Sequence, residues 1–122
     1  MSKEPFKIGA RIKSFSHAFR GIGIALSAEH NLWVHFLAMI AAIFLGLWFE
    51  ITRMEWIAVF FAIGLVLSAE LLNSAIESLG DAISEEHNDH IGRAKDMAAG
   101  GVLITAITAL VIGVVVFLPY FL

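Results

Sequence analysis

Hydrophobic residues form three long stretches in this chain, and most charged residues lie outside them. Leu32–Phe49 and Ala98–Leu122 contain no charged residue, and Trp56–Leu79 contains only Glu70 and Glu77. A helix needs about 20 mainly apolar residues to cross the hydrocarbon core of a bilayer. The pattern therefore predicts an all-α integral membrane fold with three transmembrane helices, at residues 32–49, 55–79 and 98–121.

A different pattern precedes the first span. Apolar residues recur there every three or four positions, which predicts an amphipathic helix over residues 5–28, lying on the membrane surface. A helix packed on a soluble core would show the same period, but the three spans that follow favour the surface. The apolar positions are Ile8, Ile12, Phe15, Phe19, Ile22 and Leu26.

Basic residues are concentrated before the first span, at Lys3, Lys7, Arg11, Lys13 and Arg20. Positive charge favours the cytoplasmic side of a membrane. We therefore expect a cytoplasmic N-terminus, an external turn at 50–55, a cytoplasmic connection at 81–97 and an external C-terminus. This topology is that of a multi-pass protein of a cell membrane.

Composition agrees with a membrane protein. Of the 122 residues, 59% are hydrophobic, which is far more than in an ordinary soluble domain. The chain has no cysteine, so disulfides and thiolate sites are excluded. Its net charge of −3 argues against nucleic acid as a partner.

Polar residues interrupt the second span with helical spacing. Glu70, Asn73, Glu77 and Asp81 fall on one face of a helix. An ionisable group in the hydrocarbon region costs at least a few kcal/mol, so it suggests a functional site. Three carboxylates on one face also repel each other unless a cation or proton lies between them. Alternatively, Glu77 and Asp81 reach water at the helix end, and Glu70 alone carries protons in a small transporter.

Charged residues from three elements converge on the cytoplasmic side. Glu29 begins the first span, the acidic stripe ends the second, and Lys95 and Asp96 precede the third. Carboxylates suit Mg²⁺ bound together with substrate phosphates. A lysine offsets phosphate charge, and a deeper carboxylate such as Glu70 can take a proton from a hydroxyl. These parts favour phosphoryl transfer from a nucleotide to an alcohol, although the sequence contains no Walker-type phosphate loop.

Other polar residues have simpler interpretations. Glu85, Glu86 and Asp89 are typical of a solvated loop. His30 and His35 are expected to cap or pack rather than bind metal. An assembly subunit without chemistry would leave the buried acid without a role.

Two segments carry a family resemblance. They are Glu70-Leu-Leu-Asn73-Ser-Ala-Ile-Glu77-Ser-Leu-Gly-Asp81 and Gly92-Arg-Ala-Lys95-Asp96-Met, followed by Val102-Leu-Ile. Together they resemble the small prokaryotic diacylglycerol kinase family, which includes undecaprenol kinases. The resemblance extends from Arg11 to the third span.

The resemblance implies a homotrimer of three-span subunits with active sites at subunit contacts, using ATP and Mg²⁺. It implies that Glu70 is the general base, that Glu29 and Glu77 hold the metal and contact ATP, and that Asn73 and Asp81 support the site. It also implies nucleotide contacts at Arg11, His17, Glu86, His87, Lys95 and Asp96, and lipid contacts at Asn31, Glu70 and Ala99.

The lipid itself is suggested by two further patterns. Arg11-x-x-Ser14-Phe15-x-x-Ala18-x-x-Gly21 and Glu29-x-Asn31-x-x-x-His35 look more like the undecaprenol kinase branch than the diacylglycerol branch. The expected reaction is therefore phosphorylation of a membrane lipid alcohol, with undecaprenol favoured over diacylglycerol.

Overall fold

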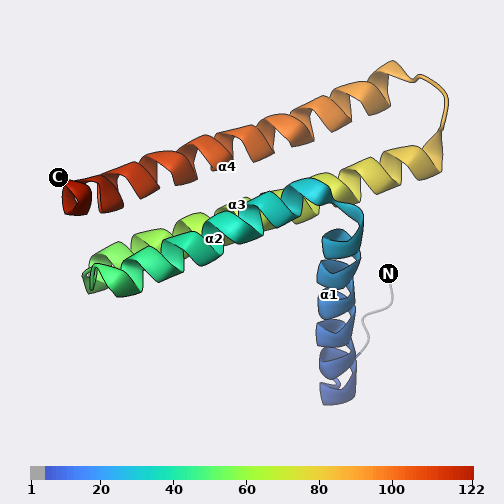
Figure 1. The fold of residues 1–122 in the computed structure, drawn as a ribbon. Coiled ribbons are helices and arrows are strands. Elements are labelled where there is room, and N and C mark those ends of the chain that lie inside the picture. The colour runs from blue at the N-terminus through green and yellow to red at the C-terminus, as the bar shows by residue number, and fades with distance from the viewer. Residues whose placement is uncertain (1–4) are drawn as a thin grey trace.

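The computed structural model describes residues 5–122, which form four helices and no strand (Figure 1). Lys3, one of the basic residues used to orient the chain, lies outside the described residues. The helices are α1 (Ile8–Ala28), α2 (His30–Trp48), α3 (Arg53–Ile83) and α4 (Asp89–Phe121). α2, α3 and α4 are each long and apolar enough to cross a membrane. The predicted all-helical fold with three such helices is confirmed.

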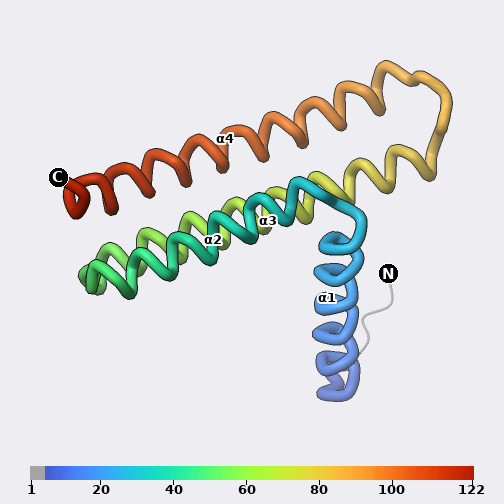
Figure 2. Tube along the Cα trace, viewed as in Figure 1, coloured from blue at the N-terminus to red at the C-terminus, as the bar shows by residue number. Residues whose placement is uncertain are grey.

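The three apolar helices run side by side, and α1 leaves them at a steep angle (Figure 2). α3 and α4 form the most extensive antiparallel pair, and α2 lies along the N-terminal part of α3. The stripe residues of α1 contact little of the chain, since Phe15 is 67% exposed and Phe19 is 72% exposed. The surface location predicted for this helix stays a prediction.

A sharp corner at Glu29 separates α1 from α2. Glu29 has extended backbone angles (φ −112°, ψ 109°), which end one helix and begin the next. The indole Nε1 of Trp33 donates a hydrogen bond of 2.9 Å to the carbonyl oxygen of Leu26, across the corner. This bond fixes the start of α2 beside the last turn of α1.

The turn between α2 and α3 is closed by a cap. Thr52 accepts a hydrogen bond from the backbone N–H of Glu55, and the Glu55 carboxylate accepts one from the Thr52 N–H. This capping box satisfies backbone groups that a helix start leaves without partners. Tyr120, near the end of α4, donates its hydroxyl hydrogen to the same Glu55 carboxylate.

A small buried cluster lies under this turn. Its buried members are Ile51, Val59, Val116 and Phe117. They come from the turn, from the first part of α3 and from the last part of α4. The cluster therefore joins the start of α3 to the end of α4. The best-packed part of the described chain lies at this end of the bundle.

At the other end, helix extends further than the hydropathy pattern indicated. α3 continues to Ile83, and α4 begins at Asp89, so the segment expected as a connection over 81–97 is mostly helical. Asn88 accepts hydrogen bonds from the backbone N–H groups of His90 and Ile91, which starts α4 early. Hydropathy marks where a helix becomes polar, whereas the cap determines where the helix begins.

Candidate active site

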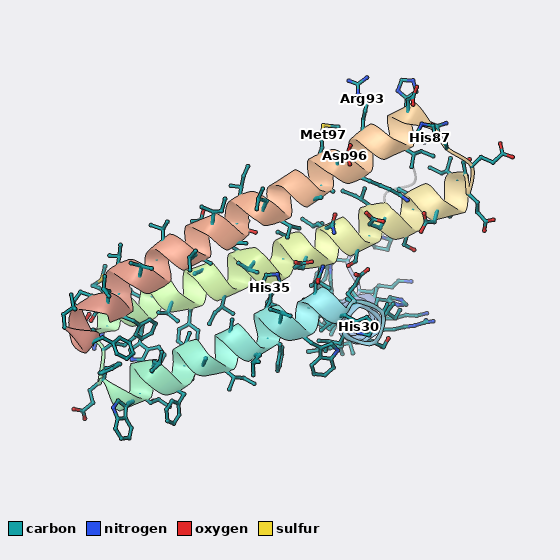
Figure 3. All side chains as sticks on the ribbon, turned by 45° about the horizontal axis from the view of Figure 1, so that its top comes forward. His30, His35, His87, Arg93, Asp96 and Met97 are labelled. Carbon is teal, nitrogen blue, oxygen red and sulfur yellow. The ribbon has the colours of Figure 1, made fainter. Side chains whose placement is uncertain are left out.

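Glu70 is the one buried polar or charged residue among residues 5–122, at 6% exposed. It lies on α3, and its Oε1 is 2.8 Å from Nε2 of His35 on α2. Figure 3 shows His35 on the α2 side that faces α3. Sequence reasoning missed this pair. The sequence did contain a signal for it. His35 and Glu70 lie equally far from the turn, on opposite arms of the predicted hairpin.

Asn73 lies one turn beyond Glu70 on α3. Its side-chain oxygen Oδ1 is buried and has no hydrogen-bond partner among the described residues. A buried acceptor without a donor costs on the order of 1–3 kcal/mol. This oxygen is therefore available to a donor from outside the described chain, such as a hydroxyl group.

Further along the stripe, α4 brings a cation to two carboxylates. Lys95 Nζ is 2.6 Å from Oδ1 of Asp81 and 3.8 Å from Oε2 of Glu77. Gly80 permits this approach, since a Cβ there would lie 2.9 Å from Ile91 Cγ2 and 3.0 Å from Lys95 Cε. One lysine thus faces two acids, and the local charge stays negative.

Glu29 reaches the level of this cluster through the hairpin. His35 contacts Glu70 across the hairpin, and six residues from each of them lie Glu29 on one arm and Ile76, next to Glu77, on the other. α1 also contacts α3. Both carboxylates are half-buried.

Two carboxylates are the donor chemistry that Mg²⁺ uses together with phosphate oxygens. Within residues 5–122, no group of three or more His, Cys, Asp or Glu side chains is close enough to hold a metal ion. A metal held by Glu29 and Glu77 would therefore need its remaining ligands from a nucleotide and water, and this role stays a prediction. The two residues do not form a closed metal cage.

A polar cavity of about 260 Å³ opens where α3 passes into α4. It includes the predicted residues Glu86 and His87, together with Asp81 and Lys95. The lining is Asp81, Ser84, Glu85, Glu86, His87, Asn88, Ile91, Gly92 and Lys95. The cavity is a candidate position for part of a phosphate-bearing ligand.

Other predicted site residues of the same chain do not line this cavity. Arg11 and His17 are exposed on α1, which leads away from the cluster, and the Arg11 guanidinium lies 5.2 Å above the Phe6 ring. Asp96 is exposed on α4 and does not line the cavity (Figure 3). Asn31 and Ala99 are also exposed, near the starts of α2 and the apolar part of α4.

The fold and this geometry define a class: a small helical protein of the membrane type, with a charged site at one end of its apolar helices. The sequence profile described as prokaryotic diacylglycerol kinase matches residues 16–117. The undecaprenol kinase of Bacillus subtilis (strain 168) is 41% identical over 107 residues, covering 88% of this chain and 87% of that protein. The diacylglycerol kinase of Escherichia coli (strain K12) is 31% identical over 100 residues, covering 82% of each. The chain belongs to the prokaryotic diacylglycerol kinase family.

Proposed function

We propose that this protein is a lipid kinase, which transfers the γ-phosphate of ATP to the hydroxyl group of a membrane lipid. One observation carries the proposal. The buried Glu70 lies on the same face of α3 as Glu77 and Asp81, which meet Lys95 about 10 to 16 Å further along the helix. A proton acceptor within the apolar part of the helix suits a lipid alcohol. A charged cluster at the helix ends suits a nucleotide.

Glu70 acts as the general base in this reaction. Its carboxylate takes the proton of the lipid hydroxyl while the hydroxyl oxygen bonds to the γ-phosphorus. The bond between that phosphorus and the oxygen bridging to the β-phosphate breaks, and ADP leaves with the electron pair. Asn73 lies one turn further along α3 and supports the site from there, since the single hydroxyl hydrogen goes to Glu70. Glu70 then loses its proton to water.

Residues at the helix ends bind the nucleotide. Glu29 and Glu77 would hold Mg²⁺, which would neutralise part of the phosphate charge. Lys95 contacts phosphate, and Asp81 positions Lys95 through the 2.6 Å contact. Further contacts come from Arg11, His17, Glu86, His87 and Asp96.

The active protein is a homotrimer in this account. Arg11 and His17 lie on a helix that leads away from the cluster of its own chain. A second copy can supply the missing contacts, and the family resemblance points the same way. Crosslinking in detergent should yield trimers, and an active monomer would contradict this assembly.

The protein spans the prokaryotic cell membrane with its N-terminus in the cytoplasm. The basic residues of α1 and the location of ATP support this orientation. Labelling of single cysteines introduced at either end of α3 tests it, because the chain has no cysteine of its own. External labelling near Ile83 would reverse the topology.

Undecaprenol is the favoured lipid, and diacylglycerol is the alternative. The undecaprenol kinase relative is 41% identical to this chain, compared with 31% for the diacylglycerol kinase relative. The experiment supplies purified protein in detergent with ATP, Mg²⁺ and either lipid. We expect faster phosphorylation of undecaprenol, and a preference for diacylglycerol would reverse the choice. A proton-coupled carrier built on Glu70 finds no support in these relatives.

A further inference from the structure

We propose that His35 is a positioning residue for Glu70, holding one carboxylate oxygen so that the other faces the lipid hydroxyl. The inference rests on the proposed function. It starts from the 2.8 Å contact between His35 Nε2 and Glu70 Oε1. The sequence alone did not predict this role, because His35 was expected to cap a helix or to pack.

The position of the hydrogen between these two atoms follows from the chemistry of the base. A carboxylate that is to accept a proton from an alcohol must itself carry none. The hydrogen between the two atoms is therefore on His35 Nε2, and Glu70 Oε1 accepts it. Oε2 stays free for the reaction.

The surroundings make this contact hard to replace with water. The Glu70 side chain is 8% exposed and that of His35 is 25% exposed. An apolar cavity of about 580 Å³ extends from His35 between α2, α3 and α4. His35 is the one ionisable residue among the described residues that line it. A close contact between an N–H group and a carboxylate is stronger in such a place than in water, and its loss leaves the carboxylate without that partner.

A purely structural contact would tie α2 to α3 and affect stability alone. A positioning role predicts a different outcome, because misdirection of Glu70 slows the chemical step while ATP binding at the helix ends continues. The structure places Lys95 and the connection cavity well away from the α2–α3 contact along α3. The turnover number and the KM for ATP therefore separate the two roles.

The kinetic test compares His35→Leu with His35→Gln, whose amide N–H can replace the Nε2 donor. We expect His35→Leu to lower kcat by about 10- to 100-fold, the equivalent of losing a hydrogen bond to a charged group. The KM for ATP should change by less than about twofold, and His35→Gln should restore kcat to within about fivefold of wild type. His30→Leu, an exposed histidine on the same helix, is the matched control and should behave as wild type.

Full kcat in His35→Leu, or an effect confined to thermal stability, would overturn the proposal. A wild-type protein that phosphorylates neither lipid would overturn the proposed function itself, so the two failures differ. If His35→Leu does not fold, solid-state NMR of histidine-labelled wild type and Glu70→Leu decides. We expect a protonated Nε2 whose signal moves when Glu70 is removed, and an unmoved signal would refute the pair.

Discussion

The two ends of the helical bundle treat their polar groups in opposite ways. At the turn between α2 and α3, the Glu55 carboxylate accepts hydrogen bonds from the Thr52 backbone and from Tyr120. At the connection between α3 and α4, Lys95 faces both Glu77 and Asp81, and Asn73 Oδ1 has no partner in the described chain. The polar groups named at the first end find partners within one chain, whereas the second end has an acceptor and charges still to be matched.

This difference separates stability from function. The turn end also holds the buried cluster of Ile51, Val59, Val116 and Phe117, so substitutions there should act on folding. The connection end has a polar cavity and excess negative charge in place of a core. Unmatched polar groups cost free energy, and binding of a cation, phosphate or hydroxyl offsets that cost.

The largest expected effect is at Glu70. Glu70→Gln keeps the size of the side chain and removes the proton acceptor, so phosphorylation should fall by about 10²- to 10⁴-fold. Trimer content, measured by crosslinking, should match that of wild type. Unchanged turnover in this variant would refute the assignment of the base.

Glu77 should control the metal requirement. Glu77→Ala removes one of two proposed metal ligands, and we expect the Mg²⁺ concentration for half-maximal rate to rise about tenfold or activity to vanish. Titration of activity with Mg²⁺ measures it. Metal dependence identical to wild type would count against the metal role.

Lys95 gives the next effect. Lys95→Met keeps most of the side-chain length without its charge, and the KM for ATP should rise about 10-fold. Arg53→Met, at the exposed turn end, is the matched control and should leave the KM unchanged. Equal effects in the two variants would remove the distinction between the ends.

Gly80 tests the close approach of α4 to α3. In Gly80→Ala the new Cβ would lie within 3.0 Å of Ile91 and Lys95, so Lys95 must shift and kcat/KM for ATP should fall several-fold. Gly64→Ala on the same helix adds a Cβ with no atom within 4 Å and serves as the control. Wild-type kinetics in both would show that the approach is not needed.

The smallest effect on activity should be at the turn end. Tyr120→Phe removes the hydroxyl that donates to Glu55 and keeps the ring that stacks on Phe49. We expect the melting temperature in detergent to fall by a few degrees and kcat to stay unchanged. If kcat/KM for ATP fell more in Tyr120→Phe than in Gly80→Ala, the comparison between the two ends would be overturned.

Sequence patterns predicted much of this architecture. The apolar stretches gave the three long helices, and helical phase put Glu70, Asn73, Glu77 and Asp81 on one face of a helix. The helix ends escaped prediction, because Asn88 caps α4 inside a segment whose polarity suggested a loop. Pairing across helices also escaped, since periodicity within α2 says nothing about which α3 residue meets His35.

The choice of partners at the site depended on packing. Lys95 meets Asp81 at 2.6 Å because Gly80 lets the helices approach, and no one-dimensional pattern contains that distance. The absence of a partner for Asn73 Oδ1 is likewise a property of the surrounding volume. The roles of all the predicted site residues, from the base Glu70 to the lipid contacts Asn31 and Ala99, stay predictions.

The central claim is that ATP turnover is coupled to phosphorylation of a lipid alcohol. The direct measurement quantifies ADP and phosphorylated lipid together, using purified protein, ATP labelled on the γ-phosphate, and undecaprenol in detergent. The account predicts one labelled lipid phosphate for each ADP, and almost no ADP without lipid. ADP formation independent of lipid, or no label in undecaprenol or diacylglycerol, would contradict it.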